Sequence, residues 1–125
     1  EYFNNVIRKI TPDGTVTTFA GKPGKGGFAD GKVEEAQFLH PQTLSFAPDG
    51  SLIVADTGNN RVRRISPQGE VSTLAGTGAS EKVTTGALPA ELHLPYGVLA
   101  LADGSVLVTG LNAILRIQPS KLLKA

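Results

Sequence analysis

Residues 4–21 read NNVIRKITPDGTVTTFAG and residues 59–76 read NNRVRRISPQGEVSTLAG, so one pattern returns after 55 positions. A second pair of stretches overlaps the first. Residues 40–54, HPQTLSFAPDGSLIV, match residues 94–108, LPYGVLALADGSVLV, at an offset of 54. Two matches of this length at nearly one period indicate an internal structural repeat. The chain is therefore expected to fold as an array of similar units.

Turn signals cut each repeat into short strands. In the complete unit, the sequences Pro-Asp-Gly, Thr-Gly-Asn-Asn and Pro-Gln-Gly separate four apolar runs. Pro presets a turn, and Gly or Asn accepts the positive φ that tight hairpins need. We therefore expect strands at 43–47, 52–56, 61–66 and 70–75. The run 52–55 is apolar at every position, so both faces of that strand need cover, which neighbouring sheets provide in a β-propeller.

The predicted fold is all-β, a β-propeller fragment of four-stranded antiparallel blades in an incomplete ring. In order, the chain carries the last two strands of a first blade, a loop, a complete second blade, a second loop, three strands of a third blade and a tail, at residues 1–21, 22–39, 40–76, 77–93, 94–119 and 120–125. The incomplete blades supply strands at 6–10, 15–20, 97–101, 105–109 and 113–118. Repeat arrays need capping or closure, so we expect further blades or further copies to complete the ring.

The stretch DGSLIVADTGNNRVRRISPQGEVSTLAG, residues 49–76, resembles the NHL repeat. Blades of that family read as an extended strand, an Asp, an Asn-Arg turn and a strand that ends in Arg or Lys plus an apolar residue. The third unit has a shorter turn and departs from the pattern at three positions, where Gly110, Ala113 and Leu115 replace Asp56, Arg61 and Arg63. The resemblance implies a ring of about six blades and a habit of binding proteins, nucleic acid or carbohydrate, but the fold alone implies no single activity.

The composition is that of a globular chain, with 40% hydrophobic and 18% charged residues and a net charge of +1. The chain has no Cys, which excludes disulfides, thiol nucleophiles and thiolate metal sites. No apolar run is long enough for a membrane span, and no membrane contact is expected. The chain begins at Glu1 without Met, so we interpret it as a piece of something longer.

Polar residues gather at the turn between the second and third strands of a blade. Asp and Asn side chains bond to nearby backbone amides and so hold tight turns. Because the Asn-Asn pair recurs in the first unit, we interpret the set as structural rather than functional. Its members are Asp56, Asn59, Asn60, Asn4 and Asn5.

Arginines recur on the third strand, where Arg61, Arg63 and Arg64 follow Arg8 of the unit before. Some propellers of the resembled family bind RNA through a basic face, and these four residues are the candidates for one. Alternation along a strand, however, sends Arg61 and Arg63 to one face and Arg64 to the other. No aromatic residue is interleaved for base stacking. We therefore expect these arginines to reach Asp side chains or backbone carbonyls across blades, which disfavours nucleic acid as a partner.

Catalytic and metal-binding patterns are not found in the sequence. The two histidines, His40 and His93, do not occupy equivalent repeat positions. Metal-dependent lyases on related propellers place His directly after the Pro that precedes the first strand, where this chain has Gln42 and Tyr96. Neither is a usual metal ligand. We expect no catalytic residue, no metal site and no cofactor.

The two long loops differ far more between units than the strands do, and loops commonly carry recognition on propellers. The glycine-rich start of the first loop lacks the Lys-Ser/Thr ending of a phosphate-binding loop. The candidate residues for contact with a partner, in these loops and just past the second, are Lys22, Lys25, Phe28, Asp30, Glu81, Lys82 and Tyr96.

We therefore predict a non-enzymatic interaction or scaffold module, which binds a protein partner through the loops between blades or through the propeller face. One alternative is part of a propeller enzyme, a lyase or hydrolase, whose active site lies in other blades. A second alternative is RNA binding through the basic face. Open strand edges also template pairing, so self-association of the half-blade at residues 6–20 with another copy stays in view.

Overall fold

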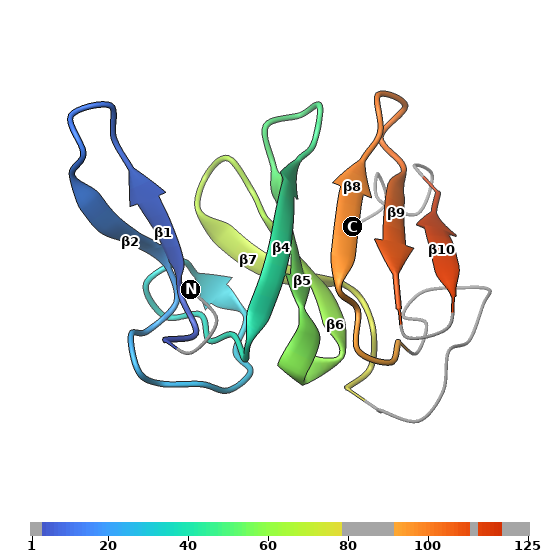
Figure 1. Cartoon of the computed structure of the whole chain (residues 1–125), viewed down its shortest axis with the longest axis horizontal. Coiled ribbons are helices and arrows are strands. Elements are labelled where there is room, and N and C mark those ends of the chain that lie inside the picture. The colour runs from blue at the N-terminus through green and yellow to red at the C-terminus, as the bar shows by residue number, and fades with distance from the viewer. Residues whose placement is uncertain (1–3, 79–91, 111–112, 119–125) are drawn as a thin grey trace.

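The structure is a computed structural model that describes residues 4–78, 92–110 and 113–118. Its elements, in chain order, are β1 (Ile7–Ile10), β2 (Val16–Ala20), β3 (Gly31–Lys32), β4 (Pro41–Phe46), β5 (Leu52–Asp56), the short 3-10 helix η1 (Thr57–Asn59), β6 (Arg61–Ile65), β7 (Glu70–Ala75), β8 (Gly97–Ala100), β9 (Val106–Thr109) and β10 (Ile114–Ile117). They form three antiparallel sheets that stand side by side (Figure 1). The sheet orders are β1-β2, β3-β7-β6-β5-β4 and β10-β9-β8.

The all-β fold predicted from the turn signals is confirmed. Each of the nine predicted strands is present, with ends within two residues of those expected. The difference is β3, which lies inside the segment 22–39 that we expected to be a loop. Its two residues pair with Val71 and Glu70 along the outer edge of β7. The connection between the first two blades thus covers the free edge of the strand that ends the second blade, which is a common way of protecting a sheet edge.

Two hydrophobic cores fill the spaces between neighbouring sheets. Leu52 and Val54 of β5 belong to the core shared with the first sheet, whereas Ile53 belongs to the core shared with the third. This division follows from the alternation of side chains along a strand. All five residues of β5 are buried. The apolar run in the middle blade therefore has the cover on both faces that its sequence requires.

The outer sheets are partial copies of the middle blade. By repeat position, β1 and β2 correspond to the third and fourth strands of a blade, β6 and β7, and β8–β10 correspond to the first three. Ile10 on β1 is 70% exposed, whereas Ile65, its equivalent on β6, is 1% exposed. The difference arises because Ile65 lies beside the first two strands of its blade, and Ile10 has no such strands beside it in the described part of the chain.

Candidate binding face

The two ends of the blades carry different kinds of connection. Hairpin turns that join β1 to β2, β4 to β5 and β8 to β9 lie at the upper end in Figure 1. The connection from β2 to β4, helix η1 and the chain entering β8 lie at the lower end. We call the lower end, formed by residues 22–39, 57–60 and 92–96, the loop end, and the upper end the hairpin end. Most of the candidate contact residues within the described chain lie at the loop end.

Two asparagines join successive blades at the loop end. The side-chain oxygen of Asn5 accepts a 2.8 Å hydrogen bond from the backbone N–H of His40, and that of Asn60 accepts a 2.8 Å bond from Leu94. Both acceptors and both donors have positive φ. The same arrangement therefore occurs in consecutive repeats. We expected these side chains to hold their own turns, whereas the structure has them reach the residue that precedes the next blade.

The other members of the polar turn set bond both within their turn, as expected, and outside it. Asn59 Nδ2 donates to Asp56 Oδ2 and to the carbonyl oxygen of Gly27, both at 2.7 Å. Asp56 Oδ1 accepts a 2.8 Å bond from the N–H of Leu39. The backbone carbonyl of Asn4 accepts from Gly24. These contacts fasten the connection 22–39 to the blades on either side of it.

Arg63 is the centre of this fastening, and its side chain is fully buried. Its Nη1 lies 2.7 Å from Asp56 Oδ2 and its Nη2 lies 2.7 Å from Asp30 Oδ1. The same guanidinium donates to the carbonyl oxygens of Gln37 and Ala29, and Nε donates to Asp30. All five N–H groups of the guanidinium therefore have acceptors, which is what a buried charge requires.

The Asp56 carboxyl is withdrawn from water despite these bonds. Burial raises the pKa of the Asp56 carboxyl, and this effect outweighs the hydrogen bonds from Asn59 and Leu39 and the charge of Arg63, which act in the opposite direction. The side chain is fully buried, like that of its partner. Asp56 and Arg63 therefore depend on each other to remain in the interior.

Phe28 lies against the same cluster. The guanidinium carbon of Arg61 is 3.7 Å from the centroid of its ring, and that of Arg63 is 4.6 Å away. Arg61 also donates to the carbonyl oxygen of Thr77. Phe28 is nevertheless 41% exposed. Two of the residues expected to contact a partner, Phe28 and Asp30, are thus held in place by intramolecular contacts and still reach the surface.

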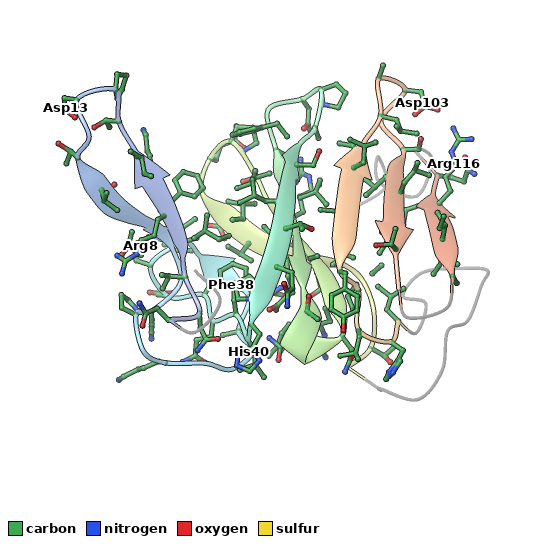
Figure 2. All side chains as sticks on the ribbon, in the orientation of Figure 1. Arg8, Asp13, Phe38, His40, Asp103 and Arg116 are labelled. Carbon is green, nitrogen blue, oxygen red and sulfur yellow. The ribbon has the colours of Figure 1, made fainter. Side chains whose placement is uncertain are left out.

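The structure does not bring the four candidate arginines together on one basic face. The side chain of Arg63 is in the interior, and the guanidinium of Arg61 packs on the ring of Phe28. Arg64 forms a 2.9 Å ion pair with Asp49 at the hairpin end. Arg8 lies on the first sheet, where it donates to Thr18 (Figure 2). Arg61 and Arg63 lie on one face of their strand and share the ring of Phe28, as alternation predicts, whereas Arg64 and Arg8 lie elsewhere.

The remaining candidate contact residues differ in exposure. Lys25 and Tyr96 are exposed, and Lys22 is half-buried. The carbonyl oxygen of Tyr96 accepts a 2.6 Å bond from Thr43 on β4, which fixes the backbone at that point. Glu81 and Lys82 lie outside the described residues. Lys25 and Tyr96 therefore present side chains to solvent from a loop end whose backbone is held by the blades.

The described residues contain no group of three or more His, Cys, Asp or Glu side chains placed to hold a metal ion. His40 and His93 are half-buried, and Gln42 is exposed on β4. Within the same described part, no helix is long and apolar enough to cross a membrane.

The sequence analysis did not single out Thr57, although it also joins two blades. Its hydroxyl is buried and donates a 2.5 Å bond to the carbonyl oxygen of Pro95. Ser45 on β4 also links the middle blade to the third sheet, because its hydroxyl oxygen accepts a hydrogen bond from the N–H of Ala100 on β8. Their only sequence signal is a small hydroxyl residue beside a repeated turn or on a first strand, and many surface positions share that signal.

Three sheets joined in this way, with cores between them and repeated links at one end, are blades of a β-propeller. Residues 38–65 match the family model described as the NHL repeat. The chain belongs to the NHL-repeat propellers, as its sequence resemblance implied.

Known proteins share parts of this sequence and fold. The chain is 45% identical over 64 residues to the chloroplastic protein SUPPRESSOR OF QUENCHING 1 of Arabidopsis thaliana, a match that covers 50% of this chain and 6% of that protein. It is 31% identical over 115 residues to Teneurin-1 of Caenorhabditis elegans, covering 87% of this chain and 4% of that protein. A crystal structure of a protein of unknown function from Bacteroides thetaiotaomicron superposes with a TM-score of 0.83 at 26% identity, over 93% of this chain and 30% of that one. The chain thus spans a small part of each relative.

Proposed function

We propose that this chain is a non-enzymatic interaction module that binds a protein partner at its loop end. The observation that carries the proposal is the way in which the connection 22–39 is held. Arg63 donates to three residues of that connection, Ala29, Asp30 and Gln37, while Lys25 remains exposed. A surface whose backbone is already ordered loses less conformational entropy when it binds.

The chemistry of the exposed residues supports a protein as the partner. Phe28 and Tyr96 are each 41% exposed, and aromatic side chains are enriched where proteins contact one another. Lys25 adds a positive charge at the same end of the blades. A partner surface with an apolar pocket and a carboxylate at its rim would suit this combination. Gln42 and Tyr96, which stand where related lyases place His, favour binding over catalysis.

The proposal is tested by comparing variants at the two ends of the blades. A partner is captured from the source cells on the immobilised chain, identified, purified, and titrated against wild type and variants. Tyr96→Ala and Lys25→Glu should each weaken its binding, and Tyr96→Ala by about tenfold or more, as expected for an aromatic anchor. Gln68→Ala changes an exposed residue at the hairpin end and should bind as wild type does.

Equal binding by all of these variants would contradict the loop end as the contact surface. Turnover of a substrate by the purified chain, without a saturable protein partner, would overturn the non-enzymatic assignment.

A further inference from the structure

The guanidinium of Arg61 is held in place by contacts with two loops. Its carbon lies 3.7 Å from the centroid of the Phe28 ring, and its Nη2 donates a 3.1 Å hydrogen bond to the carbonyl oxygen of Thr77. Gly78 also lies against it, since a Cβ added there would be 3.0 Å from both Nη1 and Nη2. A ring, a hydrogen bond and a close backbone therefore fix the position of a half-buried cation beside the loop end.

Arg61 differs from Arg63 in how many of its N–H groups have acceptors. The two residues are two positions apart on β6, so their side chains lie on the same face. All five N–H groups of Arg63 are bonded within the protein. Arg61 uses one of its five, for Thr77, so over the described residues four remain for an external acceptor.

The repeat does not account for Arg61. The positions equivalent to it hold Val6 in the first unit, which is fully buried, and Ala113 in the third. By contrast, Asn60 has its equivalent in Asn5, and both side chains join blades in the same way. A residue that every blade needs recurs from unit to unit, whereas Arg61 does not. Its role therefore lies outside the building of the blade.

The charge around the site favours a carboxylate as the ligand. A guanidinium donates two parallel N–H groups to a carboxylate or a phosphate, and one that is already held loses less entropy on binding. Asp30 and Asp56 place two carboxylates around the single cation of Arg63. The guanidinium carbon of Arg63 is 4.6 Å from the centroid of the ring on which Arg61 packs, so this excess of negative charge is nearby. It disfavours a dianionic phosphate more than a singly charged carboxylate.

We propose that Arg61 and Phe28 form a carboxylate-binding site, which takes an Asp or Glu side chain flanked by an apolar residue in the protein partner. Arg61 donates to both oxygens of the carboxylate. The Phe28 ring, which is 41% exposed, packs against the neighbouring apolar side chain. This inference rests on the proposed function only in taking the partner to be a protein, because the site itself can be tested with short peptides.

NMR titration of the 15N-labelled protein tests the site directly. The probe is the peptide Ac-Leu-Glu-Phe-NH2, and its matched control is Ac-Leu-Gln-Phe-NH2, which has nearly the same shape without the charge. The Nε–H signal of Arg61, assigned by its absence from Arg61→Gln, should move on titration with the first peptide at millimolar concentration and not with the second. Inorganic phosphate is the third probe, and it should need about tenfold more to move that signal.

Variants separate this site from a general attraction between charges, with binding followed by the backbone N–H signal of Phe28. Arg61→Lys keeps the charge but loses the fork, and should raise the dissociation constant of the Glu peptide about tenfold. Gly78→Ala should also weaken binding, because its Cβ displaces the guanidinium. Arg64→Gln is the matched control, since Arg64 is a partly exposed arginine on the same strand that pairs with Asp49, and binding should be unchanged. A dispersed amide spectrum shows that each variant is folded.

Several results would overturn the carboxylate site. They are an Arg61 signal that does not move, equal movement with both peptides, phosphate as effective as the Glu peptide, and binding that is unchanged in Arg61→Lys or lost in Arg64→Gln. The proposed function fails separately, because its own test changes Lys25 and Tyr96. Peptide binding at Arg61 without any captured partner would contradict the proposed function and support the site.

Discussion

The free-energy costs of removing Asp56 and Arg63 one at a time should add up to much more than the cost of removing both together. Arg63→Leu leaves the Asp56 carboxylate without its cation in a fully buried site, and Asp56→Ala leaves the equally buried Arg63 with Asp30 as its remaining carboxylate partner. Breaking such a pair costs about 3–5 kcal/mol, a large part of the roughly 5–15 kcal/mol by which a domain is stable. In the double variant no buried charge remains, and the loss is that of the loop contacts and of the acceptor for Leu39.

The coupling energy is the difference between the summed losses of unfolding free energy in the two single variants and the loss in the double variant. It should reach about 2 kcal/mol or more. Urea denaturation at a concentration where the chain is monomeric measures all four free energies of unfolding. The half-exposed pair Asp49–Arg64 is the matched control, since the same two substitutions there should couple by about 0.2–1 kcal/mol. Additive effects at Asp56 and Arg63 would refute the view that the two charges hold each other in the interior.

Two further predictions concern the turns. Gly76→Ala should destabilise the fold by more than Gly14→Ala in thermal unfolding, although both positions have positive φ. An added Cβ at Gly76 would lie 2.4 Å from the carbonyl oxygen of Asn60, whereas one at Gly14 meets nothing within 4 Å. Equal losses of stability would show that strain in φ alone decides. The pKa of Asp49 is lowered to about 2, mainly by the hydrogen bond from the backbone N–H of Ser51 and next by the bond from Arg64. The ionised Asp49 carboxylate therefore stabilises the fold above pH 3.8, the ordinary pKa, and this stabilisation is lost as the pH falls from there towards 2. Because the carboxyl is mostly exposed, the contribution is small, and it is seen as a shallower acid slope of the urea midpoint in Asp49→Asn; an unchanged slope would contradict it.

The strands were predictable because each is bounded by local chemistry. Pro, Gly and Asn fix the turns, and these turns recur at one period, so a single register assigns all nine strands. Strand β3 was not predictable in this way, since Gly31 and Lys32 have no strand pattern and pair only because the edge of β7 lies beside them. Local pattern determines where a strand can begin and end, whereas edge pairing depends on what the completed sheet leaves open.

In the candidate site, too, local patterns could be predicted from the sequence, whereas contacts between distant residues could not. We expected the arginines to reach Asp side chains or backbone carbonyls across blades. Arg63 does bond to groups of both kinds, but they lie in its own blade, at Asp56, and in the connection 22–39. The sequence did not predict which groups Asn5 and Asn60 contact, because each side-chain oxygen accepts from a backbone N–H some 35 residues away. Repetition of the Asn pair signalled that the residues were structural, but only the geometry shows that they join one blade to the next.

The third unit indicates why the buried pair exists. Its chain has Gly110 where the middle blade has Asp56, and Leu115 where it has Arg63, so both charges are replaced together. Electrostatics accounts for that joint change, because a single replacement would leave one charge buried without a partner. The third sheet nevertheless forms, with β9 and β10 paired along four residues. The pair is therefore not needed to form the paired strands of a blade. What Arg63 adds is an attachment for residues 29–37, and in the function proposed above that attachment orders the loop end before a partner binds.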